Sequence, residues 1–163
     1  MRRVVNLVRL AAATAAIGFA SAGASEPAVQ APAVEALVAS TDACTGKVSS
    51  DKKMREMWTA QGWEFRTRVE EGGIVLSAYR RGDIHLHYAT ASIMKTCSVW
   101  ASIPADYDVE PLVKAMTVKL NKVPKIDAPG ARYYFQNYRG LKILNLLVKE
   151  DQRGRYVELS VVH

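Results

Sequence analysis

Two histidines separated by one residue carry the clearest chemical signal in this sequence. His85 and His87 lie within the segment IHLHY, and in an extended strand both side chains emerge on the same face, about 7 Å apart. Two imidazoles placed in this way can supply two ligands to a metal ion, with Glu64 or Asp83 as candidates for a third. The alternative, which we favour, is a pair of surface histidines, because the sequence contains no H-E-x-x-H motif and no further Cys/His cluster.

Polar and aromatic residues of the neighbouring strands are expected on the same sheet face as the two histidines. Tyrosine, arginine and histidine suit a binding surface because they combine contact area with directed hydrogen bonds. An ordinary solvated sheet face is the alternative. The candidate binding residues are Arg66, Arg68, Tyr79, His85 and His87. In the expected register they share their face with Glu64 and Ser77.

The loop after Arg80 decides which side chains share that face. A two-residue loop of Gly82 and Asp83 would place Leu86 on the face opposite Ala78. A three-residue loop, Arg81 to Asp83, with Gly82 at positive φ, would place the apolar side chains together. Because a slip of one residue moves every side chain to the other face, we expect burial to select the three-residue loop.

Cys44 and Cys97 are the only cysteines of the chain. An even number of cysteines in an exported protein predicts a disulfide, which would close a loop worth about 4 kcal/mol in the chain-entropy model. The alternatives are two buried thiols or one catalytic cysteine. No histidine and carboxylate near either cysteine in the sequence suggest catalysis, and the wide spacing fits no zinc pattern.

Residues 1–24 have the pattern of a cleaved secretory signal peptide. Three arginines fall within the first nine residues, residues 10–20 are apolar apart from one threonine, and a small-x-small sequence ends at Ala24. The apolar run is shorter than a membrane span requires. We expect cleavage after Ala24, with Ala22 as the second choice. An uncleaved anchor or an amphipathic surface helix is the alternative.

Composition and charge exclude several classes of protein. The chain has 163 residues, of which 49% are hydrophobic and 23% are charged, as in an ordinary folded domain and unlike a disordered chain or a multi-pass membrane protein. Removing the three arginines of the signal lowers the 22 Lys+Arg to 19 against 16 Asp+Glu, so the net charge falls from +6 to +3. The remaining charges are interspersed, which leaves an anionic partner as a minor possibility.

The rest of the chain predicts a single α+β domain over residues 42–163. Residues 25–41 are an Ala/Pro-rich lead that we expect to be flexible, although residues 33–41 are equally compatible with a short helix. Hydrophobic periodicity and capping residues predict helices over 49–61 and 108–121. Alternation and turn residues predict strands, namely 63–70, 74–80, the strand with the two histidines, 93–103, 131–138, 141–149 and 155–162.

Local patterns give three more specific expectations. Gly72-Gly73 is the expected loop of the first hairpin, so that Val69 faces Leu76, and alternation places Phe65 and Val69 on one face. Pro124 and Pro129 mark a loop. The apolar stripe of the second helix consists of Leu112, Val113, Met116 and Leu120.

Short turns between these strands predict antiparallel pairing. The expected fold is therefore an antiparallel sheet of about seven strands in the order α-ββββ-α-βββ, with two helices packed on one face and one disulfide. A helix followed by hairpins occurs twice, but without similarity of the residues, so a sequence repeat is not inferred. Tyr133 and Phe135 are expected in the core, and Trp63 and Trp100 are expected to be packing residues.

We expect a small periplasmic or secreted binding or accessory protein without catalytic activity. Its partner would be an unknown protein or a small ligand of the cell envelope, without nucleic acid, without a cofactor, and without a transmembrane span after signal cleavage. The sequence contains no G-x-S-x-G, P-loop or G-x-G-x-x-G motif. One alternative is a small metal-dependent or hydrolytic envelope enzyme that uses His85 and His87. Another is an envelope stress protein that binds anionic surfaces.

Overall fold

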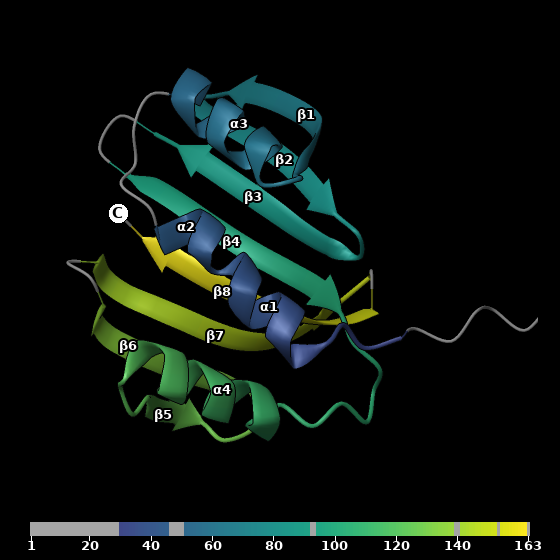
Figure 1. Cartoon of the computed structure of the whole chain (residues 1–163), viewed down its shortest axis with the longest axis vertical. Coiled ribbons are helices and arrows are strands. Elements are labelled where there is room, and N and C mark those ends of the chain that lie inside the picture. The colour runs from purple at the N-terminus through teal and green to yellow at the C-terminus, as the bar shows by residue number, and fades with distance from the viewer. Residues whose placement is uncertain (1–29, 46–50, 92–93, 139–140, 153, 163) are drawn as a thin grey trace, which may run out of the picture.

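The computed structural model describes residues 30–45, 51–91, 94–138, 141–152 and 154–162. The expected signal peptide lies outside the described residues. Within them the chain forms one antiparallel sheet of eight strands, and all the helices lie on one face of it (Figure 1). The α+β class and the antiparallel sheet are therefore confirmed, with eight strands where about seven were expected.

The sheet consists of two halves that repeat the same order, a helix followed by four strands. The first half contains α3 (Asp51–Ala60), β1 (Glu64–Glu71), β2 (Ile74–Arg81), β3 (Ile84–Thr90) and β4 (Lys95–Ser102). The second half contains α4 (Glu110–Leu120), β5 (Lys125–Ala128), β6 (Arg132–Tyr138), β7 (Leu141–Asp151) and β8 (Gly154–Val162). The strand order is β1-β2-β3-β4-β8-β7-β6-β5. Antiparallel pairing of β4 with β8 relates the halves approximately by a two-fold rotation, although their sequences show no similarity.

Strand β5 is the element that the sequence analysis missed. It has only four residues, lies between Pro124 and Pro129, and pairs with β6 at the sheet edge. Short, charged edge strands carry weak hydrophobic alternation because neither face is fully buried. The two prolines indicated a loop, and they bound the strand instead.

Both predicted long helices form, and each uses its apolar stripe against the sheet. Helix α3 buries Met54 and Trp58, one turn apart, and Gly62 follows it with φ of +82°, as a C-terminal glycine does. Helix α4 has Pro111 in its first turn, where its missing N–H costs nothing, and ends at Asn121 in the left-handed conformation.

The first hairpin has the expected register, but a bulge changes the faces of β1. The loop is Gly72-Gly73, and Val69 pairs with Leu76 as predicted. A shift of register at Arg66 then interrupts the alternation, so that Phe65 lies beside Tyr79 on the helix-covered face. The expectation that Phe65 and Val69 share one face is therefore wrong, because a bulge inserts one residue into the strand.

The second hairpin corrects the predicted loop. Arg81 pairs directly with Ile84, so the loop is the two-residue Gly82-Asp83 and not Arg81 to Asp83. Gly82 has φ of +58°, which suits the first position of a tight hairpin turn. In this register Tyr79 pairs with Leu86 on the buried face. The prediction failed because it assumed that Ala78 is buried with Leu86, whereas Ala78 lies on the opposite face, which no described helix covers.

An N-terminal segment of two short helices crosses the middle of the sheet. Helices α1 (Val34–Ser40) and α2 (Asp42–Thr45) lie over β4 and β8 between α3 and α4 (Figure 1). Leu37 is fully buried there. Of the two alternatives for residues 33–41, the structure therefore shows the short helix. We expected the folded domain to begin at residue 42, but it also includes this helix.

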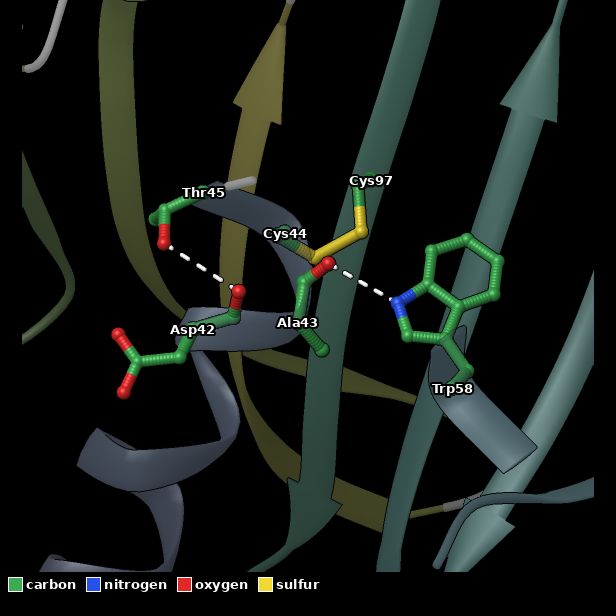
Figure 2. The surroundings of a disulfide bond; sticks show 6 residues. All are labelled: Asp42, Ala43, Cys44, Thr45, Trp58 and Cys97. Carbon is green, nitrogen blue, oxygen red and sulfur yellow. Dashed lines mark hydrogen bonds between the residues drawn. A yellow bond between two sulfur atoms is a disulfide. The ribbon is translucent and has the colours of Figure 1, made fainter. Parts of the chain in front are cut away.

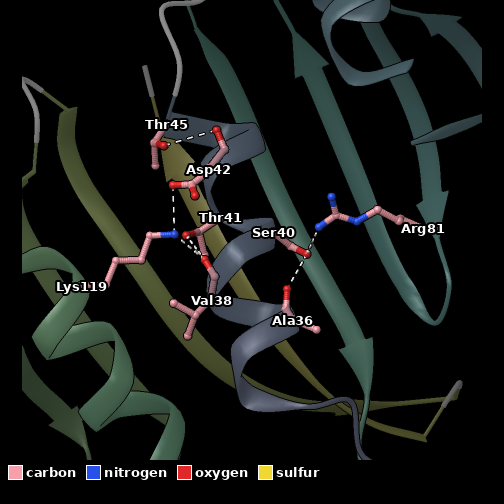
Figure 3. Close-up of polar contacts among 8 residues, drawn as sticks. All are labelled: Ala36, Val38, Ser40, Thr41, Asp42, Thr45, Arg81 and Lys119. Carbon is pink, nitrogen blue, oxygen red and sulfur yellow. Dashed lines mark hydrogen bonds and ion pairs between the residues drawn. The ribbon is translucent and has the colours of Figure 1, made fainter. Parts of the chain in front are cut away.

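Both halves hold this N-terminal segment. On the first half, the predicted disulfide joins Cys44 of α2 to Cys97 of β4, and Trp58 Nε1 donates a hydrogen bond of 3.0 Å to the carbonyl of Ala43 (Figure 2). Arg81 of β2 also donates to Ser40 Oγ at 2.8 Å (Figure 3). The segment is therefore tied covalently to the strand at the centre of the sheet.

On the second half, one lysine of α4 makes the corresponding contacts. Lys119 Nζ lies 2.9 Å from the carboxylate of Asp42 and donates to the carbonyl of Val38 at 2.6 Å (Figure 3).

In the residues that the structure describes, no helix combines the length and the hydropathy that a membrane span requires.

Candidate functional sites on the two faces of the sheet

The structure separates the five candidate binding residues onto two faces. His85 and His87 lie on the open face, which is the face that no described helix covers. Arg68 and Tyr79 lie on the helix-covered face, because the two-residue loop at Gly82-Asp83 places Ser77 and Tyr79 on the face opposite the histidines and Arg68 pairs with Ser77. Arg66 sits at the bulge in the edge strand and forms an exposed ion pair of 2.8 Å with Glu64. The single site expected from the sequence is therefore two sites.

On the open face, the two histidines flank an indole. Trp100 of β4 stacks on His85 with ring centroids 4.1 Å apart and planes 8° apart. His87 meets the same indole edge-on at 5.6 Å, and Trp100 Nε1 donates a hydrogen bond of 3.4 Å to His87 Nε2. Tyr156 of β8 packs on the other side at 5.7 Å. We call His85, His87, Trp100 and Tyr156 the aromatic cluster.

Polar side chains of the central strands surround the aromatic cluster. Lys149 and Glu158 form an ion pair of 2.6 Å, and Asn145 Nδ2 donates to Ser160 Oγ at 3.5 Å. Ser98 occupies the same face of β4 as Trp100 by the alternation of the strand. The middle of the open face is therefore aromatic. Its surroundings are polar toward β7 and β8, whereas the apolar Ala78 of β2 lies beside His87 on the other side.

The cluster favours neutral imidazole at His85. Burial lowers the pKa of His85 below its ordinary value of 6.5, and the nearby Arg80 and His87 lower it further. The carboxylate of Asp83 opposes this effect only in part. A neutral ring stacks on an indole without the cost of desolvating a charge.

The residues proposed to complete a metal site are engaged elsewhere. Glu64 pairs with Arg66, and Asp83 lies 3.3 Å from Arg80. Across the described residues, no group of three or more His, Cys, Asp or Glu side chains gathers in a way that could hold a metal ion. His85 and His87 lie on the same sheet face, as expected, and the side chain that both of them contact is Trp100.

On the helix-covered face, the first half contains a pocket between α3 and strands β1, β2 and β3. Its volume is about 240 Å³. The residues that line it are Asp51, Lys52, Arg55, Trp58, Arg68, Ser77, Tyr79 and Tyr88. We call it the α3 pocket. Two of the five candidate binding residues, Arg68 and Tyr79, line this pocket, together with residues of α3 and β3.

The inner end of the α3 pocket is aromatic and carries hydroxyl groups. The ring of Trp58 meets Tyr79 at 4.9 Å and Tyr88 at 5.2 Å, both edge-on. Burial raises the pKa of Tyr88 to about 12. Burial also raises the pKa of Tyr79, although Arg55 beside its hydroxyl counters part of the rise. Both phenols are thus protonated at neutral pH and are able to donate hydrogen bonds.

Sequence reasoning missed the residues that complete both sites. Trp100 alternates with the buried Cys97 and Val99, so the strand pattern itself predicts that it lies on the opposite face. The expectation of a packing residue does not use this signal. Arg55 and Tyr88 carried no comparable signal. Their contribution to a pocket depends on how α3 lies across the sheet.

The chain was also compared with known proteins. Searches of protein-family models, of curated proteins and of solved structures each returned no match. The functional argument therefore rests on the geometry of the open face and of the α3 pocket.

Proposed function

We propose that this protein is an exported, non-enzymatic binding module that engages a protein partner through the open face of its sheet. The observation that carries the proposal is the aromatic cluster at the centre of that face. All helices of the described chain lie on the other face (Figure 1), so the cluster contributes nothing to packing between sheet and helices.

The composition of the open face favours a protein over a small molecule. Protein interfaces have an aromatic centre, depleted in charge, with a polar rim, and tryptophan and tyrosine are among the residues that supply most of the binding energy at such centres. The aromatic cluster, with Asn145, Ser160 and the Lys149–Glu158 pair around it, follows this arrangement. The clustered rings also lose little conformational freedom on binding, because they already pack against one another.

Export is supported by two independent features. The disulfide Cys44–Cys97 is of the kind that persists in oxidising compartments, and the N-terminal sequence has the arginine-rich and apolar regions of a signal peptide. Mass spectrometry of the protein purified from its native host should find Ser25 as the first residue. An intact Met1 or a cytoplasmic location would contradict export.

A photo-crosslinking residue at Ser98 tests the binding face. We expect the full-length chain, expressed in its native host, to form a discrete crosslinked product with another protein when the photoreactive group is at position 98. The same group at Val118, which is 76% exposed on α4, is the matched control and should give no such product. Trp100→Ala in the Ser98 variant should abolish the product, because it removes the centre of the cluster.

Three outcomes would contradict this function. These are the absence of any product from position 98, the same products from positions 98 and 118, and a product that contains only a second copy of this chain. Circular dichroism and thermal unfolding of the Trp100→Ala chain confirm that a lost product reflects the surface and not the fold.

A further inference from the structure

We propose that the α3 pocket binds a small anion through a carboxylate or phosphate group. This site lies on the helix-covered face of the sheet, and it is independent of the partner proposed for the open face. It is built from residues of α3, β1, β2 and β3.

The first argument is a buried hydroxyl without a partner. Tyr88 is only 3% exposed, its side chain lines the α3 pocket, and its hydroxyl has no hydrogen-bond partner in the described chain. A buried donor left unpaired costs about 1–3 kcal/mol. Phenylalanine at this position would keep the ring contact with Trp58 without that cost, so the hydroxyl is explained by a ligand that accepts its hydrogen bond.

The second argument is the charge around that hydroxyl. Lys52, Arg55 and Arg68 line the same pocket, against one carboxylate, Asp51. Arg55 packs over the ring of Phe65 at 4.6 Å and is part of no ion pair among the described residues. Arginine in such a setting binds oxyanions through charge-assisted hydrogen bonds.

The register of the first hairpin brings Arg68 to the pocket. Arg68 pairs with Ser77, which is 8% exposed and lines the pocket, so the two side chains share the helix-covered face. The bulge at Arg66 lies N-terminal of this pair and turns Phe65 to the same face, beside Tyr79. Bulges commonly redirect a side chain toward a functional site, and here the redirected ring is the one over which Arg55 packs. Glu70 lies 3.7 Å from Arg68, at a distance that leaves the guanidinium able to contact a ligand.

The size and walls of the pocket limit the ligand. A volume of about 240 Å³ is below the range of drug-sized sites, so it accommodates a small acid or the charged end of a larger molecule. Trp58, Tyr79 and Tyr88 form an apolar wall beside the donors. The expected ligand is thus a small molecule with an oxyanion attached to a short apolar group. The oxyanion is either a carboxylate or a phosphate ester.

Calorimetric titration of the full mature chain tests the site with two probes, benzoate for the carboxylate and phenyl phosphate for the phosphate. We expect saturable binding of at least one probe with one site per chain. Arg68→Gln should weaken it by about tenfold, because a charge-assisted contact is lost. Tyr88→Phe should weaken it by a smaller factor without lowering the melting temperature of the free protein.

Asp51→Asn gives a change in the opposite direction. Its carboxylate is close enough to the hydroxyls of Tyr79 and Tyr88 to affect their pKa values, so its removal should tighten anion binding. A structural role for the pocket residues would not produce an increase in affinity.

Two matched controls lie outside the pocket. Arg132→Gln removes an equally exposed arginine that is paired with Asp127 in the second half, and Tyr107→Phe removes another buried hydroxyl without a partner. Neither should change affinity. The proposal is overturned if neither probe binds, or if the pocket variants and the controls bind alike. Binding of benzoate alone or of phenyl phosphate alone supports the site and identifies the source of the oxyanion.

Discussion

The two halves of the molecule share one architecture and use their helices differently. In the second half, α4 buries four apolar side chains, Leu112, Val113, Met116 and Leu120, over a face formed by Tyr133, Phe135, Leu144 and Leu146. In the first half, α3 buries only two, Met54 and Trp58, and the strands beneath it present Arg68, Ser77, Tyr79 and Tyr88. One helix closes a core, and the other helix covers a pocket.

Their buried tyrosines show the same difference. Tyr133 in the second half accepts a hydrogen bond from the amide of Gly130 and donates one to Glu110, both at 2.8 Å. Tyr88 in the first half is equally buried and has no partner for its hydroxyl. The hydroxyl of Tyr133 is satisfied by its own half, whereas the hydroxyl of Tyr88 is a donor that a ligand would complete. This contrast is the reason why the anion site is proposed in the first half.

The largest expected effect concerns the link between the N-terminal segment and the first half. Replacing both cysteines, Cys44→Ser with Cys97→Ser, should lower the free energy of unfolding by about 4 kcal/mol, because the unfolded chain regains the entropy of a long closed loop. Denaturant unfolding measures the change. Equal stability of the two proteins would mean that the hydrogen bonds of the segment, and not the disulfide, hold it on the sheet.

A pair of tyrosine substitutions tests the contrast directly. Tyr133→Phe should cost about 1.5 kcal/mol, because it removes a bond to a charged acceptor and leaves the Gly130 amide unpaired. Tyr88→Phe should be neutral or stabilising, because it removes an unpaired hydroxyl. Thermal unfolding of both variants provides the comparison. A similar loss in each would show that Tyr88 is satisfied and would weaken the case for the pocket.

Lys119 tests how the second half holds the N-terminal segment. Lys119→Met keeps most of the aliphatic chain but removes the ion pair with Asp42 and the hydrogen bond to Val38. Because the ammonium group is partly buried, we expect a loss of about 1 kcal/mol. Hydrogen exchange should increase in α1 more than in β7. An unchanged rate in α1 would leave the first half as the main anchor.

The smallest effect is the pH dependence that His85 contributes on the open face. Its pKa is lowered in the folded protein, so as pH falls through 6.5 the unfolded chain binds the proton first, and the free energy of unfolding decreases. His85→Gln should make this decrease shallower. Denaturant unfolding above and below pH 6.5 measures both slopes, and identical slopes would exclude His85 as the source.

Local patterns were sufficient for most elements of the fold. The stripe of Leu112, Val113 and Met116 predicted α4, and the glycine pair at 72–73 predicted the first hairpin with its register. These predictions succeeded because each depends on neighbours within a few residues, either one helical turn or one tight loop. The disulfide was predictable because only two cysteines exist to pair.

The candidate sites were less predictable, because faces depend on what covers them. The loop at Gly82 was chosen by assuming that all apolar side chains share one buried face, yet Leu76 and Ala78 lie on the open face. The bulge at Arg66 has no local signature, and it moves Phe65 from one face to the other. A one-residue difference in either place reassigns every side chain beyond it.

The sequence by itself determined the α+β class, the pairing of Cys44 with Cys97 and the shared face of His85 and His87. The period of a strand and the count of cysteines are enough for these. Only the tertiary structure decided that the histidines flank Trp100, that Arg68 and Tyr79 lie beneath α3, and that Tyr88 lacks a partner. Those facts depend on register and on the placement of helices over the sheet, which arise from burial summed over the whole molecule and not from any local pattern.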